Sequence, residues 1–261
     1  MNAITNYDPD VYESMHPGSL QADIEWYRRK AAAAGGPVLE LGAGTGRIAI
    51  PIAEDGIRVT ALDLDAGMLA KLREKVAALP AATRELVSFH QGDMRTFSLG
   101  KTFALVIIPF RAFLHNLTTG DQLASLKRAH EHLQAGGELA FNVFHPSLQY
   151  MAAHAGSQAG TWRWTGTKDA SGGGFIVYSD STRYDTVRQR LQSMIKTEEF
   201  SAEGALLRTH MMRLELAYLY PADIARLLEK AGFELVRISG DFTGRPFEHD
   251  GDELVVEARR R

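Results

Sequence analysis

Three groups of residues in the first hundred positions could bind a ligand that contains adenosine. A glycine-rich turn, G-A-G-T-G at 42–46, follows the apolar stretch 38–41. Asp63 ends a second apolar stretch, and Asp93-Met94 follows a third. Glycines let the backbone approach a ligand because they carry no Cβ atom. A carboxylate such as Asp63 can accept hydrogen bonds from both hydroxyls of a ribose, so the spacing indicates a nucleoside or nucleotide site.

The glycine turn discriminates between two classes of such ligands. A dinucleotide site needs the pattern G-x-G-x-x-G/A, in which the third small residue lets a helix pack close to the preceding strand. Arg47 stands where that small residue is required. A nicotinamide oxidoreductase is therefore disfavoured.

These residues need elements that carry them to one place. Strand-like apolar stretches alternate with helix-like patterns through the first 150 residues, which is typical of a parallel sheet covered on both faces. The expected strands are 37–41, 57–62, 86–90, 103–108 and 138–144, and the expected helices are 19–34, one from Thr45, 66–78 and 119–133. Ser19 should cap the first helix, Pro51 should kink or shorten the second, and Thr119 and Gln122 should form a capping box. Ligands of such sheets bind at the carboxyl ends of the strands.

The pattern changes after Ser147. Residues 150–172 predict a long loop, and the segments 175–200 and 206–220 alternate apolar and polar residues as antiparallel strands do. Helix 221–231 and strands 233–239 and 252–258 follow, and the last strand should be antiparallel because no helix precedes it. We expect an α/β, Rossmann-like seven-stranded sheet with helices on both faces and an inserted antiparallel β layer. Its parts are the N-terminal segment and cofactor-binding part (1–149), the inserted strands (150–217) and the C-terminal helix and strands (218–261).

Composition narrows the possible partners. The 261 residues carry 29 Lys and Arg against 32 Asp and Glu, and the only basic block is the terminal A-R-R-R. We therefore expect a small-molecule acceptor and no nucleic acid. No apolar run could span a bilayer and no basic segment followed by an apolar one opens the chain, which predicts a cytoplasmic protein without a membrane partner. The absence of Cys rules out a thiolate nucleophile and a Cys-based metal site, and we expect no metal.

The glycine turn preceded by Glu40, together with Asp63 and Asp93-Met94, resembles class I S-adenosylmethionine-dependent methyltransferases over nearly the whole chain. This resemblance implies S-adenosylmethionine as cofactor, with Asp63 on the ribose and Asp93 on the adenine amino group. The cofactor-binding residues that it implies are Glu40, Gly42, Ala43, Gly44, Asp63, Leu64, Met68, Asp93, Met94 and Ile108. Alternatives stay open for three of them, because Glu40 could merely fix the turn, and Met68 and Met94 could fill the core.

The stretch after the fourth strand bears on the acceptor. P-F-R-A-F-L-H-N at 109–116 lacks the N/D-P-P-Y/F motif of base-directed amino-methyltransferases. It resembles bacterial small-molecule methyltransferases, including the amino-sugar N-methyltransferases, in which a His of this loop faces the acceptor. His115 matches that His and is the catalytic candidate, acting as a base if the acceptor arrives protonated.

The inserted strands resemble those of the same group and of the glycine/sarcosine methyltransferases, where this sheet covers the pocket, so 150–217 is the expected acceptor lid. The candidate substrate-binding residues are Tyr12, Arg111, His145, Arg183 and Tyr184. His145 could equally satisfy a loop end, and either Tyr7 or Tyr12 could fold over the cofactor.

The implied reaction is in-line transfer of a methyl group to a nitrogen or oxygen of a small molecule. Two alternatives remain at this point: a catalytically silent cofactor-binding protein on the same fold, and a nucleic-acid or protein methyltransferase. The identity of the acceptor, its reacting atom and the oligomeric state, with a homodimer among the options, are left open.

Overall fold

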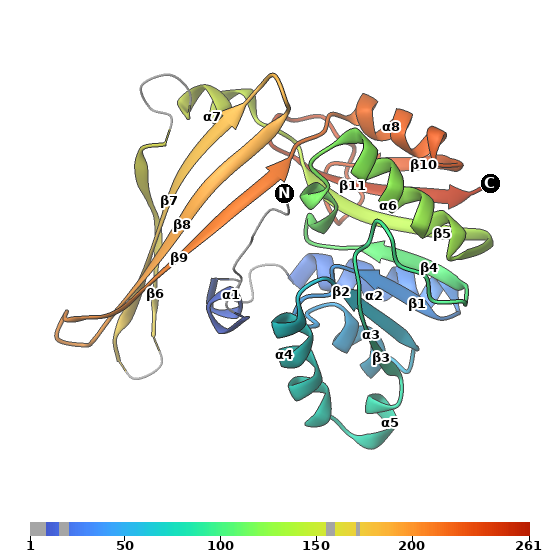
Figure 1. Cartoon of the computed structure of the whole chain (residues 1–261), viewed down its shortest axis with the longest axis horizontal. Helices are drawn as coiled ribbons and strands as arrows, with labels where there is room; N and C mark the ends of the chain where they lie inside the picture. Colours follow the sequence, from blue (N-terminus) through green and yellow to red (C-terminus); the bar gives the residue numbers. More distant parts are fainter. Residues whose placement is uncertain (1–8, 16–20, 155–159, 171–172) are drawn as a thin grey trace. The chain divides into compact units, whose positions relative to one another are not determined.

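A computed structural model describes residues 9–15, 21–154, 160–170 and 173–261. The described residues form two compact units. The smaller unit combines α1 (Pro9–Met15) with Pro146–Tyr218, and the larger unit contains the described residues from Gln21 to His145 and from Leu219 to Arg261. The expected helix cap Ser19 lies outside the described residues. Figure 1 shows the elements of both units.

The larger unit is built on a seven-stranded sheet with the strand order β10-β11-β5-β4-β1-β2-β3 (Figure 1). Its strands are β1 (Val38–Leu41), β2 (Val59–Asp63), β3 (Val87–Gln91), β4 (Phe103–Ile108), β5 (Leu133–Phe144), β10 (Phe233–Ser239) and β11 (Glu253–Arg260). β1 to β5 run parallel to one another, whereas β11 pairs antiparallel with both β5 and β10. The predicted sheet, including its antiparallel last strand, is confirmed.

Helices flank this sheet on both faces. On one face α2 (Gln21–Ala34), α3 (Ala49–Glu54) and α4 (Ala66–Ala77) share a buried apolar cluster with the central strands. Members of this cluster are Tyr27, Ala31, Ile52, Leu69, Leu72, Val38, Val59, Ala61 and Leu105. α6 (Thr119–Glu131) and α8 (Pro221–Lys230) contact each other, and they also contact β5 and β10 respectively. Between β2 and β3 lies the short α5 (Ala81–Arg84), and η1 (Ala112–His115) follows β4.

Three local predictions need correction. The helix after the glycine turn begins at Ala49 rather than at Thr45, because residues 42–48 form the turn itself, and with Pro51 inside it α3 is only six residues long. The cap of α6 is Thr118 rather than Thr119, since the Thr118 hydroxyl accepts a hydrogen bond from the Asp121 amide at 3.1 Å. The expected loop 150–172 instead contains α7 (Leu148–Ala153) and β6 (Trp162–Asp169).

The smaller unit contains a four-stranded antiparallel sheet in the order β6-β7-β8-β9. β6 pairs with β7 (Phe175–Asp185), which supplies backbone hydrogen bonds that the Gly-, Ala- and Ser-rich stretch 150–172 did not reveal. β8 (Arg190–Phe200) and β9 (Leu206–Ala217) complete the sheet. By its register, one face carries the buried side chains of Thr182, Ser193, Met212 and Leu216. The predicted inserted antiparallel layer is confirmed.

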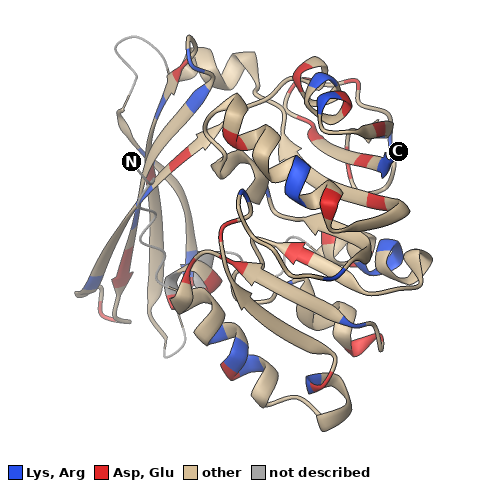
Figure 2. Ribbon diagram, turned by 45° about the vertical axis from the view of Figure 1, so that its right-hand side comes forward, with Lys and Arg blue, Asp and Glu red and all other residues tan. Residues whose placement is uncertain are grey.

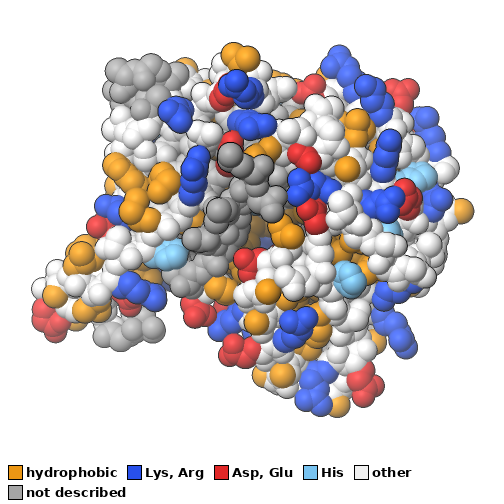
Figure 3. Space-filling view, viewed as in Figure 1, with side chains coloured by type: hydrophobic (Ala, Val, Ile, Leu, Met, Phe, Trp, Pro, Cys, Tyr) orange, Lys and Arg blue, Asp and Glu red, His pale blue; other side chains and the backbone are white. Residues whose placement is uncertain are grey.

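The surface mixes charges of both signs in both units, as Figure 2 shows along the helices and strands. Hydrophobic side chains are exposed on the smaller unit (Figure 3), and its exposed apolar residues include Trp162, Trp164, Leu206 and Met211. Among the described helices, none is both long and apolar enough to cross a membrane.

Gly46 lets the glycine turn pack against α4. Its φ is +86°, and a Cβ atom added there would lie 2.1 Å from Leu72 Cδ1. Gly56 also has a positive φ, +82°, but an added Cβ would meet nothing within 4 Å.

We predict that Gly46→Ala lowers the free energy of unfolding by about 3 kcal/mol and Gly56→Ala by about 1 kcal/mol. Both substitutions force a residue with a Cβ atom into a left-handed backbone conformation, and Gly46→Ala additionally overpacks the contact with Leu72. Urea denaturation of the two variants measures the difference. Equal losses would mean that the contact with Leu72 contributes nothing.

Candidate active site

The carboxyl ends of four parallel strands bring the predicted cofactor residues to one edge of the seven-stranded sheet. The glycine turn follows β1, Asp63 ends β2, Asp93 follows β3 and Ile108 ends β4. Because β1 pairs with both β2 and β4, and β2 pairs with β3, these ends are neighbours. The edge is where open α/β sheets bind their ligands.

Asp63 joins the glycine turn to β2. Its Oδ2 accepts a hydrogen bond from the Gly44 amide at 2.7 Å, and its Oδ1 accepts one from the Asp65 amide at 2.9 Å. Burial raises the pKa of this carboxyl group. The Leu64 amide also donates to this carboxylate. A carboxylate has about four acceptor sites, so three amide donors leave Asp63 one site for a ribose hydroxyl. An added Cβ at Gly44 would meet open space, and the neighbouring Leu64 is 58% exposed. These features fit a nucleoside.

Glu40 is buried in β1, only 1% exposed, and its Oε2 has no hydrogen-bond partner among the described residues. Burial raises the pKa of its carboxyl group to about 8, although the nearby Arg47 opposes the shift. Arg47 itself pairs with Asp23 at 2.8 Å. Glu40 is therefore mostly protonated at pH 7, and a cationic ligand group beside it would favour the ionised form.

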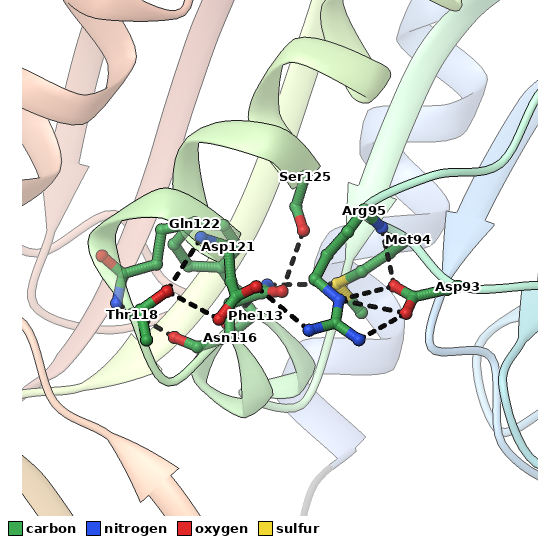
Figure 4. Close-up of polar contacts among 9 residues, drawn as sticks. All are labelled: Asp93, Met94, Arg95, Phe113, Asn116, Thr118, Asp121, Gln122 and Ser125. Atoms are coloured by element: carbon green, nitrogen blue, oxygen red, sulfur yellow. Dashed lines mark hydrogen bonds and ion pairs between the residues drawn. The ribbon is translucent and has the colours of Figure 1, made fainter. Parts of the chain in front are cut away.

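Arg95 holds Asp93 at the end of β3, and Figure 4 shows this arrangement. The Asp93 carboxylate accepts hydrogen bonds from Arg95 Nε at 2.9 and 3.0 Å and from its NH2 at 2.5 Å. These bonds lower the pKa of Asp93. The same guanidinium donates to Asp121 Oδ1 of α6 at 3.0 Å. Arg95 and Asp121 were not foreseen, although the D-x-R spacing is visible in the sequence.

The two methionines differ in their surroundings. Met68 is only 4% exposed and lies in α4, so it presents little surface to a ligand. Met94 is half-buried at the sheet edge, with its sulfur 3.3 Å from Asn116 Nδ2 (Figure 4). Among Leu64, Met68 and Met94, the most exposed apolar surface therefore belongs to Leu64.

A strained turn follows β4. Phe110 and Arg111 both have a positive φ, +54° and +64°, a conformation that costs residues other than glycine about 1–3 kcal/mol each. The Phe110 amide donates to Asn142 Oδ1 at 2.8 Å, and Arg111 pairs with Glu253 at 2.6 Å. Ile108, just before this turn, is fully buried.

Asn142 connects this turn to two other elements. Its Oδ1 also accepts from the Tyr27 hydroxyl at 2.9 Å, and its Nδ2 donates to Glu253 Oε1 at 2.6 Å. Tyr27, Asn142 and Glu253 were not among the site residues predicted from the sequence. The detectable signal was the polar Asn142 within the apolar stretch 138–144.

His115 ends η1 at the close of the strained turn and is half-buried. Burial lowers the pKa of its imidazole to about 4. His115 is consequently neutral at pH 7 and can accept a proton or a hydrogen bond.

The other predicted substrate residues lie in both units. In the larger unit, His145 lies at ring-centroid distances of 5.8 Å from Tyr220 and 5.0 Å from Phe247, with its Nδ1 3.5 Å from Asp250.

In the smaller unit, Tyr12 is half-buried on α1, and the exposed Arg183 donates to Gln192 at 2.9 Å. Tyr184 packs between the rings of Tyr150 and Tyr218. Tyr7 lies outside the described residues.

Residues 38–137 match the family model of a methyltransferase domain. This range contains all the predicted cofactor-binding residues and His115, and the sheet around it has the class I methyltransferase topology. The chain is a class I S-adenosylmethionine-dependent methyltransferase.

Three relatives illustrate the similarity of this methyltransferase to known proteins. A cypemycin N-terminal methyltransferase from Streptomyces sp. is 25% identical over 259 residues, which cover 99% of this chain and 96% of the relative. The solved CcbJ methyltransferase from Streptomyces caelestis is 27% identical with a TM-score of 0.79, covering 94% of this chain and 99% of that one. A dTDP-3-amino-3,4,6-trideoxy-alpha-D-glucopyranose N,N-dimethyltransferase from Streptomyces venezuelae is 30% identical over 134 residues, 49% of this chain and 53% of the relative.

The raised pKa of Glu40 predicts a pH dependence of the stability of the methyltransferase. In the folded protein Glu40 keeps its proton up to about pH 8, whereas in the unfolded chain it releases this proton near pH 4.5. This contribution to stability is therefore complete below pH 4.5 and is lost as the pH rises through 8. Glu40→Gln, which stays neutral, should gain stability relative to the wild type between pH 5 and pH 8.5.

Urea denaturation at several pH values measures this gain, with the exposed Glu131→Gln as the matched control. A stability difference between Glu40→Gln and wild type that does not change with pH would contradict a raised pKa.

Proposed function

We propose that this methyltransferase transfers its methyl group to an amine nitrogen of a small molecule. The observation that carries the proposal is His115, a neutral imidazole on a strained turn that directly follows the cofactor-binding strand β4. Two of the relatives are named for nitrogen acceptors, one a peptide N-terminus and one an amino sugar. Amine nitrogen is the chemistry that these two acceptors share.

In this proposal each residue at the sheet edge binds a different part of the cofactor. Asp63 binds a ribose hydroxyl, Asp93 binds the adenine amino group, and the backbone of Gly42 and Gly44 lies against the ligand. The carbonyl group near Ile108 receives the methionine ammonium. When bound, S-adenosylmethionine supplies a methyl group on a positively charged sulfur. The protein accelerates methyl transfer by aligning the acceptor with this methyl group in a site that excludes water.

His115 orients the acceptor by accepting a hydrogen bond from its N–H group. With a pKa of about 4 the imidazole is a weaker base than an aliphatic amine, so it retains little of a proton offered by an ammonium group. The amine then reacts from its neutral form, and His115 directs the lone pair.

The smaller unit would supply the acceptor lid. We assign substrate contacts to Tyr12, Arg183 and Tyr184 in that unit and to Arg111 and His145 in the larger one. The half-buried Tyr184 and the exposed guanidinium of Arg183 supply hydrogen-bonding groups that support a polar acceptor. We also propose the functional division into a cofactor-binding part (1–149), an acceptor lid (150–217) and a C-terminal part that completes the sheet (218–261).

The setting of the enzyme is part of the same proposal. The relatives above come from Streptomyces, which supports a bacterial protein. A cytoplasmic location and a homodimer are further proposals, which cell fractionation and sedimentation would test.

An acceptor screen tests the proposed reaction. We predict that the purified enzyme with S-adenosylmethionine adds 14 Da to amino sugars or small aliphatic amines and leaves their hydroxyl counterparts unchanged, because the site directs a nitrogen lone pair. Mass spectrometry of the products reads this out. Methylation of hydroxyl compounds alone would contradict the amine assignment, and methylation of none of the compounds, with the cofactor bound, would favour a silent binding protein.

His115 provides the second test. We predict that His115→Ala lowers kcat by about 10–100-fold, since misplacing the acceptor costs alignment. The Kd for S-adenosylhomocysteine should hardly change. Between pH 6 and 9 the profiles of kcat should run parallel in variant and wild type, because His115 does not titrate there. His115→Gln, which can still accept a hydrogen bond, should recover part of the rate. A wild-type decline near pH 6.5 that the Ala variant lacks would instead identify His115 as a base.

A further inference from the structure

Arg95 engages Asp93 with three separate N–H groups. The backbone amide of Arg95 donates to Oδ1 at 2.8 Å, its Nε–H is shared between Oδ1 and Oδ2, and its NH2 donates to Oδ2. Each oxygen of Asp93 therefore receives two of these four contacts, and the carboxylate is fixed in one orientation.

The guanidinium is itself held in place. Asp121 Oδ1 accepts from its NH1 at 3.0 Å, while Asp121 Oδ2 accepts from the Thr118 hydroxyl at 2.6 Å. Arg95 thus spans from the loop after β3 to the first turn of α6, as Figure 4 shows. A planar guanidinium with both ends anchored has one orientation, and a lysine ammonium could not reproduce it.

A second contact ties the same loop to the segment that follows His115. Asn116 Nδ2 lies 3.3 Å from the sulfur of Met94. Asn116 is buried and also accepts hydrogen bonds from Ser125 at 2.9 Å and, through its carbonyl group, from Gln122 at 3.0 Å. Asp93 consequently rests on a rigid support.

We propose that Arg95 is a positioning residue that sets the purine specificity of the cofactor site by fixing the orientation in which Asp93 meets the 6-amino group. The inference rests on the proposed placement of adenine at Asp93. Arg95 acts through Asp93 and need not touch the ligand.

Binding calorimetry with two ligands tests this role. The first is S-adenosylhomocysteine, and the second is its analogue with hydrogen in place of the 6-amino group. The wild type should bind the first about 10–100-fold more tightly, the range for a hydrogen bond to a charged group. In Arg95→Gln this ratio should fall below about threefold. Arg95→Lys keeps the positive charge but lacks the planar guanidinium, so its affinity ratio should also fall below about threefold. This variant replaces Arg95→Gln in the test if the Gln variant does not fold.

Arg128→Gln on α6 is the matched control, because Arg128 pairs with the exposed Glu131 away from the cofactor residues. It should keep the wild-type ratio. If Arg95→Gln or Arg95→Lys weakens both ligands equally and keeps the ratio, the role of Arg95 is only structural and the inference is overturned. A wild type that binds both ligands equally would remove Asp93 from the adenine site and overturn the proposed placement as well, whereas the acceptor screen reports on amine methylation independently.

Discussion

The geometry of the active site depends on the buried side chain of Asn142. A buried amide is stable only when its donors and acceptors are paired, and here the partners come from α2, β11 and the turn after β4. These bonds keep Phe110 and Arg111 in a conformation that a free loop would abandon. The position of His115 follows, because η1 begins where this turn ends. One polar residue in an apolar strand thus connects the core to the turn that precedes His115.

The carboxyl groups of Glu40, Asp63 and Asp93 lie at the same sheet edge, but their surroundings shift their pKa values in different ways. Burial without a hydrogen-bonding partner for one oxygen raises the pKa of Glu40, and burial also raises the pKa of Asp63 against three backbone amide hydrogen bonds. Asp93 shifts in the opposite direction because Arg95 stabilises its charge. Burial and pairing are distinct causes of a pKa shift. The edge therefore holds the mostly neutral Glu40 at pH 7 together with an Asp93 carboxylate whose charge is stabilised by Arg95.

Local patterns in the sequence were sufficient for the sheet, the glycine turn and the position of Asp63, because strand alternation and glycine spacing are short-range signals. β6 was mistaken for a loop, since the many Gly, Ala and Ser residues of the stretch 150–172 mask a strand whose stability comes from pairing with β7. The partners of Arg111 and Asn142 could not be predicted, because Glu253 is more than a hundred positions away in the chain. The link from Arg95 to Asp121 likewise depends on how α6 packs.

The two ends of the inserted segment are held together by the larger unit. His145 directly precedes Pro146–Tyr218 and Tyr220 lies just after it, and their rings are 5.8 Å apart. A segment whose ends already meet can change in length at little entropic cost. Recombination could therefore exchange this single stretch of chain between related enzymes while β1–β4 and the cofactor chemistry stay intact. In evolutionary terms, the inserted unit can diversify faster than the sheet that carries the methyltransferase domain.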